Sequence, residues 1–226
     1  MAAPSTRGRP WSEVIWDAWQ KAGVAADKAE FREVYVYAER ELARTLHILP
    51  HHNFHDLLYI KMQIELQRLS ELGHFAPAEV DEMAGKVADI CYESAKESVG
   101  RAKPVLDALS KKYPMVLVSN FYGNIGTVLE DFGISGYFNK IIESAVVGVR
   151  KPDPKIFLLG VEALGLKPEE VLVIGDSLKK DVLPAEKAGC QALWLKGKGW
   201  TKEEDDAFHP NIIGKLSDAL AFLQGE

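Results

Sequence analysis

The stretch VLVIGDSLKKDVLPAEKAG, residues 171–189, decides the fold of this chain. Its first residues, Val171–Ile174, form an apolar run that ends at a glycine, which is typical of a strand buried on both faces of a parallel sheet. From about Asp181 the pattern is helical and stops at a second glycine, so we predict a strand, a tight turn and a helix. Asp176 and Asp181 therefore lie at the carboxyl end of a buried strand, where open α/β sheets bind ligands.

Two carboxylates at such a position have two interpretations. Their hard oxygen atoms suit Mg²⁺, which commonly binds through one or two carboxylates together with phosphate oxygens of a substrate. The alternative is that Asp176 only closes a turn and Asp181 only caps a helix. Polar residues elsewhere in the chain are needed to distinguish these two interpretations.

Length and composition indicate an ordinary globular protein. A chain of 226 residues that is 47% hydrophobic can bury one large core or two smaller ones, so one or two domains are expected. A net charge of −6 with Lys and Arg spread along the chain argues against a nucleic-acid partner or an anionic membrane surface. The chain has neither an apolar run near the roughly 18 residues of a membrane-spanning helix nor an apolar signal core, so we expect a cytoplasmic location.

The two cysteines and a group of histidines are weaker signals. Cys91 and Cys190 have no companion at metal-ligand spacing, so buried reduced thiols are expected. His51, His52 and His55 stand at the start of a predicted helix, where a metal site is conceivable. Histidines beside a helix start are more often solvated loop residues.

The first hundred residues are predicted to be almost entirely helical. Residues 1–10 have no periodicity and should be irregular. Residues 11–99 then contain four amphipathic segments, and Asp27 with Glu30 forms a capping box in front of the second. Short connections between four such helices favour an antiparallel bundle.

After Gly100 strands and helices alternate. The predicted strands are residues 114–118, 140–144, 171–174 and 192–195, with helices at about 104–112, 122–132, 155–164, 181–188 and 216–223. Alternation of this kind implies a parallel sheet covered on both faces, so residues 100–226 are predicted to be a Rossmann-like α/β domain.

The ends of these strands bring further polar residues to one edge of the sheet. Ser119 and Asn120 end one strand, and Lys151 lies in a proline-rich turn, GVRKPDP. The hydroxyl of Ser119 and the amide at Asn120 can hold phosphoryl oxygens, while Lys151 can offset charge on a transferring group. Asp176 and Asp181 can hold the metal ion that clamps the same phosphate. Taken together, these residues favour a site for phosphate and Mg²⁺ over the separate structural explanations.

Three motifs resemble those of the haloacid dehalogenase-like superfamily. VLVSN resembles its second motif at Ser119, GVRKPDP its third at Lys151, and VIGDSLKKD its fourth at Asp176 and Asp181. The resemblance implies that Lys151 is catalytic and that residues 11–99 form a helical cap over the α/β domain. It also implies a magnesium-dependent phosphatase of a small phosphorylated metabolite, because dehalogenases of this superfamily use no metal and usually lack the Gly-Asp-x4-Asp pattern seen here at Asp176 and Asp181.

The chain departs from the superfamily in one respect. The first motif of the superfamily is an apolar strand ending in Asp-x-Asp-x-Thr, in which the first aspartate is the nucleophile. The segment before Trp11, MAAPSTRGRP, has no aspartate, and Asp17 lies within a helical pattern. Without that carboxylate an aspartyl-phosphate has no starting group. Truncation, a misplaced start and genuine loss all fit, and a non-catalytic phosphate- and metal-binding or regulatory protein is the main alternative, with a 2-haloacid dehalogenase less favoured.

The missing strand has a structural consequence as well. In the superfamily it lies between the strands that end here at Ser119 and Gly175. We therefore expect one of three arrangements: direct pairing of those two strands, another segment between them, or a gap of two strand spacings, roughly 9–10 Å. Unpaired edges could also pair with another chain in an oligomer.

Overall fold

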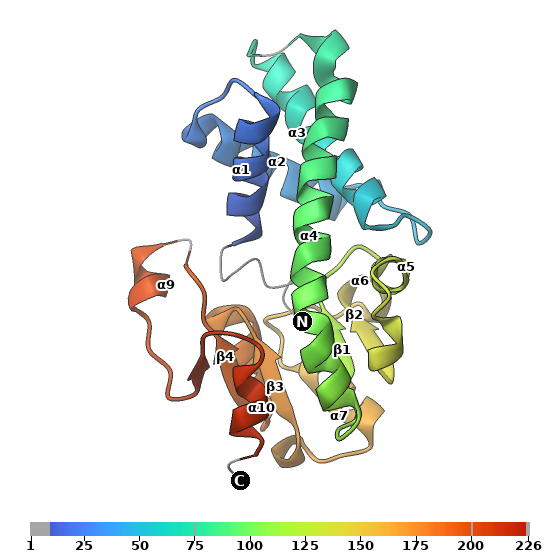
Figure 1. The fold of residues 1–226 in the computed structure, drawn as a ribbon, viewed down its shortest axis with the longest axis vertical. Helices are drawn as coiled ribbons and strands as arrows, with labels where there is room; N and C mark the ends of the chain where they lie inside the picture. Colours follow the sequence, from blue (N-terminus) through green and yellow to red (C-terminus); the bar gives the residue numbers. More distant parts are fainter. Residues whose placement is uncertain (1–9, 75, 200, 225–226) are drawn as a thin grey trace.

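The computed structural model describes residues 10–74, 76–199 and 201–224. Figure 1 shows two parts stacked along the long axis, with a group of helices at one end and parallel strands flanked by helices at the other. In these ranges no helix is long and apolar enough to cross a membrane.

The helical part is built from α1 (Trp11–Ala22), α2 (Lys28–Arg44), α3 (Phe54–Glu71) and the first half of α4 (Val80–Ser110). Capping fixes where these helices begin. Asp27 accepts hydrogen bonds from the backbone at the start of α2, and the side chain of Glu30 accepts one from the backbone N–H of Asp27. Asn53 and Asp56 form the same reciprocal pair at the start of α3. The predicted helical bundle is therefore confirmed.

The fourth helix is longer than predicted. The sequence indicated one helix ending near Val99 and another beginning at Pro104, but α4 continues through both as a single helix of 31 residues. Pro104 has no N–H, so it cannot bond to the carbonyl of Gly100 four residues earlier, yet the helix tolerates that one lost bond. The boundary predicted between residues 99 and 100 lies inside this helix, and the division into two domains stays a prediction.

The strands form two separate parallel sheets in the described chain. In the first, β1 (Val116–Ser119) pairs with β2 (Lys140–Glu143). In the second, β3 (Leu172–Gly175), β4 (Gln191–Leu195) and β5 (Ile212–Ile213) pair in that order. The remaining elements are the helices α5 (Ile125–Asp131), α6 (Ser144–Val147), α7 (Lys155–Leu164), α8 (Leu183–Lys187), α9 (Lys202–Asp206) and α10 (Asp218–Phe222), the 3₁₀ turns η1 (Pro77–Glu79), η2 (Ser135–Tyr137) and η3 (Pro168–Glu170), and a π-helical turn, η4 (Leu178–Val182).

This alternation confirms a Rossmann-like α/β part. Direct pairing of β1 with β3, one of the three expected arrangements, is wrong, because the two strands belong to different sheets. Instead, polar side chains from the turns beyond the strand ends connect the two halves. The described residues place no strand between β1 and β3. Residues 1–9, most of the segment expected to be irregular, lie outside the described residues, and oligomer formation through the strand edges stays a prediction.

One hydrophobic core joins the helical part to the first sheet. It contains buried residues of the bundle, such as Trp19 and Leu58, together with Leu117 of β1 and Val128 of α5. Phe132, at the end of α5, packs its ring 5.3 Å from that of Phe54 at the start of α3. A second core lies between α7, β4 and the helical turns that follow β3.

Candidate functional site

The turn after β3 places Asp181 against the strand end. The π-helical turn η4 begins two residues beyond Asp176, and the backbone N–H of Ser177 donates to Oδ2 of Asp181 over 3.0 Å. A Cβ atom on Gly175 would lie only 2.2 Å from Cβ of Asp181, so only glycine fits at this position. The close approach explains why this carboxylate is only 4% exposed.

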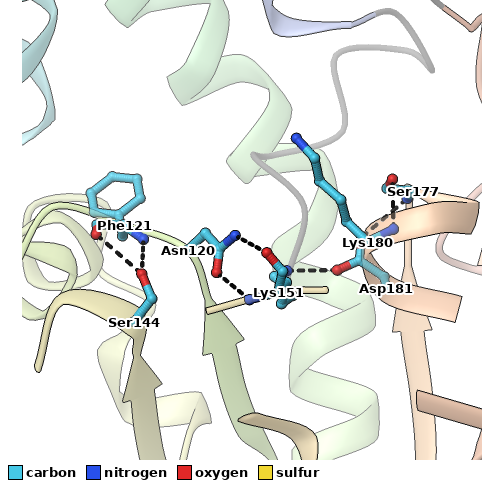
Figure 2. A network of polar contacts seen from close by, with 7 residues as sticks. All are labelled: Asn120, Phe121, Ser144, Lys151, Ser177, Lys180 and Asp181. Carbon is cyan, nitrogen blue, oxygen red and sulfur yellow. Dashed lines mark hydrogen bonds and ion pairs between the residues drawn. The ribbon is translucent and has the colours of Figure 1, made fainter. Parts of the chain in front are cut away.

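Lys151 and Asp181 form an ion pair across the two halves of the α/β part (Figure 2). Nζ of Lys151 lies 2.6 Å from Oδ1 of Asp181, and Lys151 is only 8% exposed. Burial alone would raise the pKa of Asp181, but the ammonium group of Lys151 and the N–H of Ser177 together hold it below its ordinary value. Asp181 is therefore a carboxylate at neutral pH.

Asp176 is the exposed member of the acidic pair. The protein atoms around it and the nearby Asp181 carboxylate raise its pKa to about 6. Its backbone carbonyl accepts a hydrogen bond from the indole N–H of Trp194 in β4, over 3.0 Å. The two carboxylates offer hard oxygen atoms, and their negative charges repel each other unless a cation lies between them. This donor set fits Mg²⁺.

Asn120 holds the backbone of Lys151 rather than presenting its side chain to a ligand. Its Nδ2 donates to the carbonyl of Lys151 over 3.0 Å, and its Oδ1 accepts from the N–H of Lys151 over 2.8 Å. Figure 2 shows Asn120, Lys151 and Asp181 as one line of contacts from β1 toward β3. Only the backbone amide of Asn120 is left for the predicted contact with phosphate.

The predicted residues thus differ in how directly they are joined. Asn120, Lys151 and Asp181 are linked by hydrogen bonds and an ion pair, and Asp176 is coupled to Asp181 through its charge. Ser119 is the last residue of β1 and is only 6% exposed, and it joins the group as the neighbour of Asn120.

Two further residues support the loop after β1 and were not expected from the sequence. Glu143, at the end of β2, accepts a hydrogen bond from the N–H of Gly123 over 2.6 Å. Ser144 accepts one from the N–H of Phe121 over 3.2 Å, as Figure 2 shows. Their position at the carboxyl end of the predicted strand 140–144 was the only signal in the sequence that could have identified them.

The alternative metal site at the histidines gains no support. Nε2 of His55 lies 2.7 Å from Oδ1 of Asp89, and Nδ1 of His52 accepts from the backbone N–H of Leu49. Within the described ranges, no group of three or more His, Cys, Asp or Glu side chains has a geometry that could hold a metal ion. Cys91 and Cys190 are both buried and free, as expected.

Comparison with known proteins identifies the family. A family model described as haloacid dehalogenase-like hydrolase matches residues 6–189. Because this match covers most of the chain, the protein belongs to the haloacid dehalogenase-like hydrolases.

Curated relatives match over shorter segments. A phosphoserine phosphatase of Thermus thermophilus is 35% identical over 88 residues, which are 39% of this chain and 35% of the relative. A glyceraldehyde 3-phosphate phosphatase of Methanopyrus kandleri is 46% identical over 64 residues, 28% of each chain. The matches thus span about a third of the length of these relatives.

Solved structures share the fold along nearly the whole chain. A 2-haloacid dehalogenase of Pseudomonas syringae has a TM-score of 0.54 at 19% identity, covering 99% of this chain and 92% of that one. A HAD hydrolase of Bacillus subtilis, solved with bound magnesium, has a TM-score of 0.56 at 18% identity, covering 95% and 91%. At such identities the likeness concerns the fold alone.

Proposed function

We propose that this protein binds a phosphate monoester and Mg²⁺ at the junction of its two sheets, as a phosphatase of a small phosphorylated metabolite. The observation that carries the proposal is the buried Lys151–Asp181 ion pair beside the accessible carboxylate of Asp176. A buried cation next to two carboxylates suits a ligand that brings one anion and one cation together. The phosphatases among the curated relatives, and magnesium in the related structure from Bacillus subtilis, agree with this chemistry.

In this proposal each residue has a separate task. Asp176 and Asp181 would hold Mg²⁺, which supplies a positive charge to the phosphate oxygens. Lys151 turns its ammonium group from Asp181 to a phosphate oxygen, and Asn120 keeps the backbone of Lys151 in place during that exchange. The hydroxyl of Ser119 and the backbone N–H of Asn120 donate to the remaining oxygens.

A second candidate is a protein that binds phosphate and metal without turnover. It is favoured by one observation: in the described part of the chain, no third His, Cys, Asp or Glu joins Asp176 and Asp181 in a metal-binding group.

Calorimetry and a turnover assay separate these outcomes. We expect inorganic phosphate and Mg²⁺ to bind the wild-type chain, and Asp176→Asn to weaken Mg²⁺ binding at least tenfold. Hydrolysis of p-nitrophenyl phosphate that depends on Asp176 would support the phosphatase, whereas phosphate binding without hydrolysis would support the second candidate. If neither phosphate nor Mg²⁺ binds, both are wrong.

A further inference from the structure

A small cavity lies between α4 and the end of α5, outside the site described above. It has a volume of about 200 Å³, and its walls include Tyr92, Lys96, Gly100 and Lys103 of α4 and Asp131 and Phe132 at the end of α5. This volume corresponds to about six or seven water molecules, which is less than drug-sized ligands need and suits a small metabolite. None of these residues belongs to the proposed phosphate site.

Two opposite charges line this cavity without an ion partner. Lys103 is half-buried, and an added Cβ on Gly133 would lie 3.5 Å from its Nζ, so the ammonium group lies beside the turn that ends α5. Among the described residues, neither Lys103 nor Asp131 forms an ion pair, with each other or with a third group. The hydroxyl of Tyr92 shares its hydrogen bond between both oxygens of Asp131, at 3.0 Å from each. The cavity therefore suits a molecule that carries both charges.

The wall that carries Asp131 is held in place by aromatic rings. The ring of Tyr92 stacks on that of Phe132, with centroids 5.8 Å apart and planes at 22°, and Phe132 in turn packs on Phe54 of α3. The ring of His55 meets the other side of this group, 5.5 Å from that of Tyr92. A wall fixed before a ligand arrives needs little ordering on binding, which favours affinity.

Lys96 and Gly100 supply the remaining polar groups. Lys96 lies seven residues before Lys103, which is about two turns or roughly 10 Å along the same face of α4. Its ammonium group bonds to Glu93 over 2.9 Å in an exposed ion pair, which a second carboxylate can join. The carbonyl of Gly100 lacks its helical partner, because Pro104 has no N–H. The cavity thus offers two cations to carboxylates, and one carboxylate and one carbonyl to an ammonium group.

We propose that this cavity binds a free amino acid with an acidic side chain. The ammonium group of the ligand bonds to Asp131, its α-carboxylate to Lys103 and its side-chain carboxylate to Lys96. A dicarboxylate without an amine would be repelled by Asp131, and an amino acid with a neutral side chain would leave Lys96 with Glu93 alone. This inference goes beyond the proposed function and does not depend on it, because the two sites share no residue.

A ligand in this position would connect the two sides of one helical turn. Lys96 precedes the turn at Gly100 and Pro104, whereas Lys103 lies within it and Asp131 lies opposite on α5. Figure 1 shows α5 beside the lower half of α4. Binding should therefore slow hydrogen exchange at residues 99–107 of α4.

Calorimetry on the full chain at pH 7 tests which charges of the ligand are recognised. The probes are L-glutamate, L-aspartate, glutarate, which keeps both carboxylates of glutamate and lacks the amine, and L-glutamine, whose side chain is neutral. We expect at least one acidic amino acid to bind with a Kd below about 1 mM, and glutarate and L-glutamine to bind at least about tenfold more weakly, as the loss of one charge-assisted hydrogen bond implies.

Two variants locate the site. Lys103→Met should weaken the binding of the acidic amino acid at least tenfold. Asp131→Asn should do the same and should also bind glutarate more tightly than the wild type does, because the repelling carboxylate is gone. Lys86→Met, which alters an exposed lysine of α4 paired with Glu82, is the matched control and should bind like the wild type. The side chain of Asp131 is exposed, so its substitution by Asn should not prevent folding.

Three results would overturn the inference. The first is no binding of either acidic amino acid, and the second is glutarate binding as tightly as L-glutamate. The third is binding that Lys103→Met and Asp131→Asn both leave unchanged, or hydrogen exchange that slows only outside residues 99–107, since either would place the ligand elsewhere. Binding of inorganic phosphate is measured separately and reports on the proposed function alone.

Discussion

The ammonium group of Lys151 has two possible partners at its position. In the structure it is bonded to Asp181, and it gives up this carboxylate if phosphate and Mg²⁺ bind as proposed. Lys151 and Mg²⁺ therefore compete for Asp181, while phosphate draws the lysine away.

This competition predicts opposite effects of one substitution. Lys151→Met should raise the affinity for Mg²⁺ about tenfold, because Asp181 loses its internal cation, and should lower the affinity for inorganic phosphate by at least that factor. Calorimetric titration with each ligand alone measures both. Lys155→Met, an exposed lysine of α7, should change neither. Weaker binding of Mg²⁺ in Lys151→Met would contradict the competition.

The buried Glu65 predicts a pH dependence of stability. Its pKa is about 8 in the folded protein and 4.5 for an ordinary glutamate, so between these values the folded state keeps a proton that the unfolded state has lost. Raising the pH then favours unfolding, by up to roughly 1.4 kcal/mol per pH unit, and the contribution levels off above pH 8. The stability that this group provides is thus greatest below pH 4.5.

Glu65→Gln removes this titration. Urea unfolding between pH 5 and 8 should show the variant gaining stability relative to the wild type as the pH rises. Glu93→Gln, an exposed residue of α4, is the matched control and should follow the wild type. Parallel curves for the wild type and Glu65→Gln would show that Glu65 is charged in the folded state.

The candidate site residues were predictable from the sequence, but their hydrogen-bond partners were not. Positions at strand ends and in the turns beyond them indicated Ser119, Lys151, Asp176 and Asp181, because parallel strands end at one edge of a sheet. The double hydrogen bond between the side chain of Asn120 and the backbone of Lys151 joins residues 31 positions apart. A contact between residues so far apart in the sequence cannot be predicted from a local pattern.

At the scale of elements, the turn after β3 depends on the absence of a side chain at Gly175. Gly175→Ala would place a methyl group against Cβ of Asp181 at 2.2 Å, so the π-helical turn must shift. We expect a loss of stability of about 1–3 kcal/mol, and weaker Mg²⁺ binding as Asp181 moves.

Gly126→Ala provides the matched comparison. It lies in α5, where an added Cβ would meet nothing within 4 Å, so the substitution should stabilise the protein by up to about 1 kcal/mol. Urea unfolding measures both variants. If the two variants have the same free energy of unfolding, the π-helical turn accommodates the added methyl group without loss of stability.

Secondary structure was predicted well where periodicity was strong. The four main strands and the capped helices lie close to their predicted residues, whereas the two-residue strand β5 and the short helices α6 and α9 were missed because they are too short for a hydrophobic pattern to repeat. The π-helical turn η4 was expected to be helical only from about Asp181, since its form depends on the packing of that residue against Gly175.

At the scale of the molecule, the shared core predicts that the bundle and the first sheet unfold together. Phe132→Ala removes the ring that packs on Phe54 of α3 and should cost about 3–5 kcal/mol. Hydrogen exchange should then accelerate equally in α3 and in β1. Phe208→Ala, at a side chain that is 81% exposed, should leave both unchanged. Faster exchange in α5 and β1 alone would show that the helical part is independent.

The sequence was sufficient for the class of the fold but not for the way its parts join. Alternating strands and helices indicated the Rossmann-like part, and capped amphipathic segments indicated the bundle. The separation into two sheets depends on which strands pair along their edges. Pairing joins segments far apart in the sequence, so no single segment predicts it.

The continuous helix α4 determines how the bundle can move. At 1.5 Å per residue its 31 residues make a rod of about 46 Å that belongs to both parts of the molecule (Figure 1). Any tilt of the bundle over the strand ends must therefore flex this rod, and its weakest point is the turn at Gly100 and Pro104, where one backbone bond is missing. The distance between the bundle and the strand ends at Lys151 and Asp181 then depends on the stiffness of a single helical turn.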